Sequence, residues 1–189
     1  QPTLLAASID LHTAKAHLKP FYTLTLDSVR VRMPENTATV FGMRFTPDVP
    51  PKEYHKHVKH QVELYQASAD TLLLTGFDVA AKLEEGALRA HTLYLAGVSV
   101  NIHRDKTLPL APVRPKALMA DRVTSWNVPI ALDSVLVHRA RVTYHERLKP
   151  GADYGSIAFT DIAGQLTGLS NEPRPEPPDL HLVGTARVG

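Results

Sequence analysis

Apolar and polar side chains alternate at every second position through much of this sequence, and this period constrains the fold more than any other feature. Between Thr92 and Ile102 the apolar side chains fall at Tyr94, Ala96, Val98, Val100 and Ile102. Between Arg139 and Arg147 the even positions again include apolar residues, namely Ala140, Val142 and Tyr144. Successive side chains of a β-strand point to opposite faces, so this period predicts strands with one apolar and one polar face. The chain is therefore expected to be mainly β.

The segment from Phe21 to Met33 has the same period but changes phase in its middle. Its apolar residues are Tyr22, Leu24 and Leu26, followed by Val29, Val31 and Met33. The shift at Asp27 and Ser28 predicts a β-bulge or a tight turn. Shorter strands are predicted over Ser156–Ile162 and Leu180–Val183.

A short sequence is repeated along the chain. Leu26–Val31 and Leu132–Val137 agree at five of six positions, and Ala90–Leu95 is a looser relative. Such repetition predicts an extended sheet built from similar units of strand, turn and strand.

Two helices are predicted. The first lies within Gly76–Leu88, where Asp78 can cap the helix and Gly86 can end it. The second lies around Lys116–Arg122. The stretch Glu53–Gln66 fits either a helix or a strand, and we favour a strand.

Prolines divide the chain without separating it into domains. Ten of the 15 prolines lie near 47–51, 109–115 and 173–178, where they predict loops. We expect one β-rich module over residues 1–189. Because it begins at Gln1 rather than Met, it is expected to be a processed protein or a segment of a longer one. It contains no apolar stretch long enough for a membrane helix, so any anchor is expected outside it.

Composition excludes several functions. With 21 basic and 19 acidic residues the net charge is +2, which argues against nucleic-acid binding. The absence of cysteine excludes disulfides, thiolate zinc sites and a cysteine nucleophile.

Nucleotide-binding glycine motifs and a nucleophile elbow are also absent. Asp133 and Ser134 fall on opposite faces of a predicted strand, so with His138 they cannot form a catalytic triad. We expect no enzymatic activity and no cofactor.

The densest group of metal-ligating residues is His55, His57 and His60. On a strand, His55 and His57 would share a face and could bind a metal together. Interleaved Lys52, Lys56 and Lys59 favour a solvated basic edge instead. We expect no metal site, with His55 and His57 as the candidates if one exists.

Two surface features also have alternative interpretations. A set of basic residues on the polar strand faces could contact anionic lipid headgroups or polysaccharide, although an ordinary solvated surface is favoured: Arg30, Arg32, Arg139, Arg141 and Arg147. The single tryptophan, Trp126, is expected in the core, with sugar stacking as the alternative.

The central part of the sequence resembles AsmA-like proteins of the bacterial envelope. The resemblance covers roughly residues 72–171 and is carried by these segments: Gly76-Phe77-Asp78, Leu83–Ala90, Leu93-Tyr94-Leu95, Val98–Lys106, Ala131–Val137, Ala140–Arg147 and Gly155–Ile162. The resemblance implies a periplasmic or other cell-envelope location and a membrane anchor upstream. It also implies a curved sheet of repeated strands with an apolar concave face, along which related bridge-like proteins are thought to conduct phospholipid.

We therefore expect a curved, largely antiparallel sheet of amphipathic strands with one or two short helices. The leading hypothesis is a non-enzymatic envelope module that contributes an apolar groove for phospholipid binding or transfer and for outer-membrane maintenance, with possible protein partners. The candidate lipid-contact residues are Val98, Val100, Ile102, Ala140, Val142 and Tyr144. The same six residues could instead form a closed core. The alternative is a structural or adhesion-type β-sandwich that binds a protein or glycan, and a metal-dependent enzyme using His55 and His57 is a third hypothesis.

Overall fold

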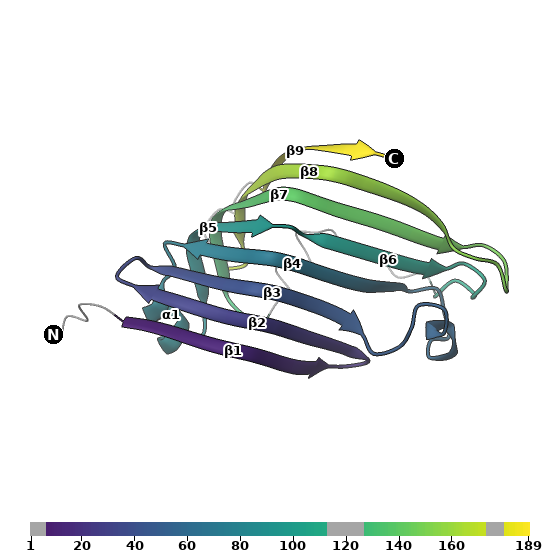
Figure 1. Cartoon of the computed structure of the whole chain (residues 1–189), viewed down its shortest axis with the longest axis horizontal. Helices are drawn as coiled ribbons and strands as arrows, with labels where there is room; N and C mark the ends of the chain where they lie inside the picture. Colours follow the sequence, from purple (N-terminus) through teal and green to yellow (C-terminus); the bar gives the residue numbers. More distant parts are fainter. Residues whose placement is uncertain (1–6, 113–126, 173–179) are drawn as a thin grey trace.

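The computed structural model describes residues 7–112, 127–172 and 180–189, and its strands form one large curved sheet (Figure 1). The prediction of a mainly β, largely antiparallel fold is confirmed. Neighbouring strands follow the chain in the order β1-β2-β3-β4-β5-β7-β8-β9, and β6 pairs with β4 and β7. Only the pairings of β5 and β6 with β7 are parallel among these strands. The strands are β1 (Ala7–Leu18), β2 (Tyr22–Met33), β3 (Thr37–Pro47), β4 (Glu63–Thr75), β5 (Leu88–Ala96), β6 (Ser99–Asp105), β7 (Ile130–Arg147), β8 (Gly155–Ser170) and β9 (His181–Val188).

The strand predicted over Thr92–Ile102 is two strands in the structure. β5 ends at Ala96 and β6 begins at Ser99. Gly97 lies between them with a φ of +63°, a conformation that few residues other than glycine adopt. Both short strands pair with β4 and β7, so they form one line in the sheet with a break at Gly97.

One predicted helix is present and is short. Helix α1 (Val79–Glu84) is capped by Asp78, whose side chain accepts a hydrogen bond of 2.9 Å from the Ala81 amide. The amide of Ala87 returns to the Ala81 carbonyl just after Gly86. The helix predicted around Lys116–Arg122 lies outside the described residues.

The strand prediction for Glu53–Gln66 is wrong over its first half. A 3-10 turn, η1 (Tyr54–Lys56), follows the prolines, and β4 begins only at Glu63. The amides of Glu53 and Tyr54 both bond to the Pro50 carbonyl. The proline pair therefore starts a turn that takes the backbone out of an extended conformation.

A line of irregular residues, which we call the first crease, crosses the sheet. The φ angle on this line is positive at Thr13 in β1, at Gly42 in β3 and at Gly97 between β5 and β6. Between them lie Asp27 and Asp70, whose side chains approach the glycines so closely that a Cβ on Gly42 or Gly97 would lie about 2 Å from a carboxylate oxygen. The strand register continues unchanged across this line. The first crease comprises Thr13, Asp27, Gly42, Asp70, Gly97 and Arg139.

Each strand shifts its apolar series by one residue at the first crease. The predicted irregularity at Asp27 and Ser28 lies on this line, where the pairs that would join residues 26 and 27 of β2 to β3 are missing from an otherwise constant register. Since the register is constant, no residue is inserted here as in a β-bulge, and the backbone changes direction without a change in strand pairing. The shift in sequence and the change in backbone therefore compensate each other, so the apolar residues stay on one face of the sheet.

A second crease lies six residues before the first along β7, at Asp133, and continues through Gly76, His91 and Gly168. Gly76 and Gly168 again have positive φ values. Residues from both sides of this line pack together: buried Ala90 and Leu132 share a cluster with Val135. In a regular strand Leu132 and Val135 would point to opposite faces. The cluster shows that the apolar face is continuous across the second crease.

We call the apolar side the inner face and the opposite side the outer face. The repeated sequence now has a structural explanation, because Leu26–Val31 and Leu132–Val137 each carry a crease aspartate followed by serine. In both, the leucine before and the valine after this pair lie on the inner face. Within the described residues, no helix is long and apolar enough to cross a membrane.

Candidate functional site: the apolar inner face

The six candidate lipid-contact residues come together on one face of two neighbouring strands. Val100 lies opposite Val142, and Ile102 lies opposite Tyr144, in the parallel pairing of β6 with β7. Val98 precedes β6, and its carbonyl accepts a hydrogen bond of 2.8 Å from the Arg141 amide. Of the candidates only Ala140 is buried, at 5% exposed, and the others are half-buried.

The same apolar row extends well beyond these two strands. The strand registers connect Val100 to Ala67 on β4 and Val142 to Phe159 on β8. Tyr22 stacks on Phe45 with ring centroids 4.5 Å apart, further along the same face. The full row, read from β1 to β9, is Ala16, Leu24, Phe45, Ala67, Val100, Val142, Phe159 and Val188.

This row was missed by the sequence analysis outside β6 and β7. The apolar alternation of each strand was visible, but the order of the strands was not. The phase shift at Asp27 was the available signal that distant strands share one crease and one face.

No second layer of described elements covers the inner face. Apart from the contacts between neighbouring strands, the described part of the chain shows only small contacts between elements, the largest of them between α1 and β5. Large apolar side chains beside the row are well exposed, including Tyr65 at 39% and Ile157 at 43%. The inner face is therefore an apolar surface that remains accessible among these elements.

The apolar face ends in a row of charged residues. Glu63 lies opposite Arg104, and Arg104 lies opposite Glu146. The Glu146 carboxylate accepts a hydrogen bond from Tyr144 (3.1 Å) and lies 2.8 Å from the Lys106 ammonium. The Lys106 contact lowers the pKa of Glu146, whereas burial raises the pKa of Tyr144. This rim alternates in sign, with Lys106 as its second cation.

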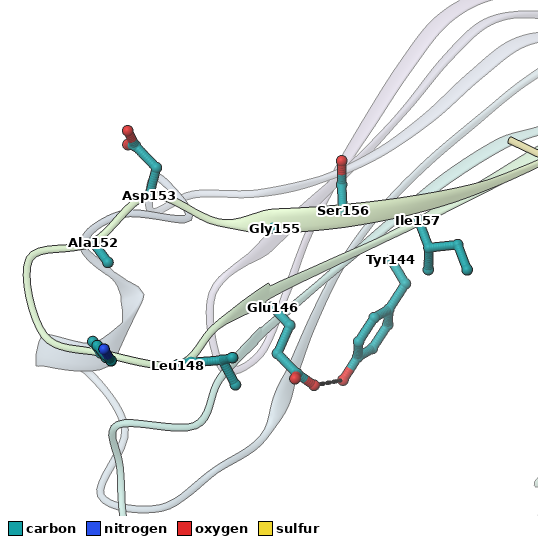
Figure 2. A pocket seen from close by; sticks show the side chains of 9 residues that line it. Tyr144, Glu146, Leu148, Ala152, Asp153, Gly155, Ser156 and Ile157 are labelled. Atoms are coloured by element: carbon teal, nitrogen blue, oxygen red, sulfur yellow. Dashed lines mark hydrogen bonds between the residues drawn. The ribbon is translucent and has the colours of Figure 1, made fainter.

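A cavity of about 470 Å³ lies beside this rim, at the hairpin between β7 and β8. Figure 2 shows Tyr144 and Ile157 pointing to the same side of the hairpin, with Glu146 bonded to the tyrosine hydroxyl. Leu148 adds a further apolar wall. The cavity thus links apolar side chains beside the row, Tyr144 and Ile157, to Glu146 of the charged rim.

A buried polar cluster covers the outer face at the same end of the sheet. Tyr54 and Asp105 are fully buried, and Arg147 is 8% exposed. Arg147 forms an ion pair with Asp105. The Tyr54 hydroxyl accepts a hydrogen bond from the Asp105 amide and donates one to the Val62 carbonyl, each 2.9 Å. We call these residues, together with His55, His103, His145 and Tyr154, the outer cluster.

Burial and charge compete within the outer cluster. Burial raises the pKa of Tyr54 to about 12. Burial would also raise the pKa of Asp105, but hydrogen bonds from Arg147 and Thr107 outweigh it and lower this pKa. Burial, together with the nearby His145 ring, lowers the pKa of His103 to about 4. At neutral pH the cluster therefore holds an ionised Asp105–Arg147 pair beside a neutral His103.

The structure changes the interpretation of the histidine candidates. His55 and His57 do not share a strand face, because the segment is a turn. The His55 Nδ1 atom accepts a hydrogen bond of 3.0 Å from the Arg147 guanidinium, while His57 is exposed. In the described residues no three metal-ligating side chains gather into a possible site.

Two other predictions about polar residues are also resolved. Arg147 was expected on a solvated surface but is buried, since its charge is matched by Asp105. Asp133 bonds to His91 (2.8 Å), whereas Ser134 bonds to Thr92 (3.1 Å), so the residue types of a triad are not connected to one another. Trp126 lies outside the described residues.

No protein-family model matches the chain, and no curated protein or solved structure matches it either.

Proposed function

We propose that this chain is a non-enzymatic cell-envelope module that holds phospholipid acyl chains on its inner face, as its resemblance to AsmA-like proteins implies. The observation that carries the proposal is the apolar row across eight strands, which no other described element covers. Exposed apolar surface of this extent is costly in water and is typical of an interaction site.

The charged rim supports a ligand with an apolar body and a polar end. Acyl chains would lie on the row containing Val100 and Val142, and the headgroup would lie near Arg104, Glu146 and Lys106. An alternating row of charges suits a zwitterionic headgroup, since it offers both an anionic and a cationic partner. The cavity at the β7–β8 hairpin lies where the two parts of such a ligand would meet.

The alternative, a β-sandwich module that binds a protein or glycan, has less support. Its architecture requires two packed sheets, whereas all strands of the described residues belong to one sheet.

The test is lipid retention by a charged variant. The chain is purified from a bacterial envelope, and bound lipid is measured by native mass spectrometry and by organic extraction. Val100→Asp places a charge on the inner face, and we expect at least a tenfold loss of bound phospholipid because burying an unpaired carboxylate against acyl chains is costly.

The matched control is Asn101→Asp, which adds the same charge to the outer face of β6 and keeps an acceptor for His145. It should retain lipid like the unmodified chain. Equal retention by a folded Val100→Asp variant would overturn the proposal.

A further inference from the structure

Strand β1 is an open edge of the sheet. In the described residues its only neighbour is β2, and every residue from Ser8 to Leu18 is exposed. Ile9 and Leu11 are 52% and 58% exposed. The outward amides and carbonyls of such a strand are unpaired and form a template for another strand. β1 contains no proline and no charged residue on its inner face to prevent this.

We propose that β1 pairs antiparallel with β1 of a second copy of this chain, in the register that places Ala7 opposite the partner's Leu18, to form a closed two-fold dimer. This proposal is independent of the proposed lipid function. It rests on the pattern of faces, sizes and charges along β1.

The order of inner-face and outer-face residues along β1 is the same whether the strand is read from Ala7 or from Leu18. The first crease at Thr13 divides the strand into two halves, so the inner residues are Ala7, Ile9, Leu11, Ala14, Ala16 and Leu18. In the proposed register each of them meets an inner residue of the partner. A slip of one residue would place inner side chains opposite outer ones. The full twelve-residue overlap provides about a dozen backbone hydrogen bonds.

Side-chain sizes are complementary in this register. Ala7 lies opposite the partner's Leu18, Ile9 opposite the partner's Ala16, and Leu11 opposite the partner's Ala14. Each inner pair thus joins one alanine with one large aliphatic residue, and the two-fold axis repeats each pair. Such cross-strand pairs are the unit by which sheets are stabilised.

Charges are complementary on the outer face. Asp10 lies opposite the partner's Lys15. Within its own chain, Asp10 bonds to Arg30 (2.9 Å) and Arg32 (3.2 Å) on the β2 side, which leaves its other side open. Lys15 forms no ion pair within the described residues. The dimer would therefore add two Lys15–Asp10 pairs.

The other edge of the sheet lacks this symmetry. In a full antiparallel overlap of β9 with itself, Leu182 would lie opposite the partner's Arg187. Leu182 pairs with inner Leu166, whereas Arg187 pairs with Thr160, beside inner Phe159. Inner and outer side chains would therefore face each other. An isologous contact through β1 closes after two copies and joins the two inner faces into one longer surface.

The absence of cysteine allows a direct test of the register. In the Leu11→Cys/Ala14→Cys double variant, the thiol at position 11 of each copy would lie opposite the thiol at position 14 of the other, within disulfide distance. We expect mild oxidation to produce a covalent dimer. The matched control, Leu11→Cys/Ala16→Cys, also uses the inner face but offsets the pair by two residues, about 7–8 Å diagonally, and should remain largely unlinked.

Sedimentation equilibrium of the unmodified 189-residue chain provides the second readout. We expect a monomer–dimer equilibrium, weakened about tenfold or more by Lys15→Glu, since both Lys15–Asp10 pairs become repulsive. Lys59→Glu, an equal charge change in an exposed loop, should leave the equilibrium unchanged. The proposal is overturned by a chain that stays monomeric up to about 1 mM, where even a weak specific contact would be populated, by assembly beyond two copies, or by equal cross-linking of both double variants.

Discussion

The inner face and the outer cluster lie on opposite sides of the same ends of β6 and β7. The polar residues of the outer cluster are buried, whereas the apolar residues of the inner face are only half-buried. On the outer side, Tyr54 and the Asp105–Arg147 pair are covered by the turn that contains η1. On the inner side, Val100 and Ile102 are only half-buried. Because apolar residues are ordinarily the buried ones, this difference indicates that the polar side holds this end of the sheet together, while the apolar side stays uncovered among the described residues.

The largest effect is expected from breaking the buried ion pair. Arg147→Ala leaves the Asp105 carboxylate without its cation, and removal of one partner of a buried pair costs about 3–5 kcal/mol. The free energy of unfolding in urea measures this loss. The control is Arg141→Ala on the same strand, where an exposed side chain should change stability by less than about 0.5 kcal/mol. Equal losses for the two variants would show that the cluster has no special role.

A smaller effect is expected at the crease that keeps apolar residues on the inner face. Gly97→Ala would place a Cβ 2.0 Å from the Asp70 carboxylate oxygen at a φ of +63°. The backbone strain costs about 1–2 kcal/mol, and displacement of Asp70 adds to it. Thermal unfolding of this variant is compared with that of Gly86→Ala, which has a φ of +71° but no atom within 4 Å of the added Cβ.

The difference in stability between the two glycine variants measures the cost of the close contact between the added Cβ at position 97 and the Asp70 carboxylate. Gly86→Ala should show the backbone cost alone, so Gly97→Ala is expected to be the less stable of the two. If they are equally stable, Asp70 moves aside freely and the crease does not depend on this contact.

The sequence was sufficient to predict several of the strands, β2 and β7 among them, but not β1 or β3 and not the arrangement of the sheet. The period of two identified the apolar sides of β6 and β7, since alternation is a local property of the backbone. The capping of α1 by Asp78 was predictable for the same reason. The pairing of β5 and β6 with β7 depends on contacts between residues about 42 positions apart, such as Val100 with Val142, which no local pattern specifies.

The outer cluster could not be predicted for a related reason. His55 was paired with His57 because they are close in sequence, but its actual partner is Arg147, 92 residues away. The two prolines before η1 were the local signal against a strand there. Likewise, Asp27 was recognised as an irregularity, but only the registers show that it lies on a line with Gly42 and Asp70.

The smallest stability effect is expected on the inner face itself. Val100→Ala removes a half-buried side chain from a surface that no other described element covers, so it should cost less than about 1 kcal/mol in the unliganded chain. Leu132→Ala, in the packed cluster at the second crease and 4% exposed, should cost about 2–5 kcal/mol. Unfolding in urea after delipidation measures both. A loss at Val100 as large as that at Leu132 would mean that the inner face is a closed core like the second-crease cluster, and the contrast between a covered polar side and an open apolar side would fail.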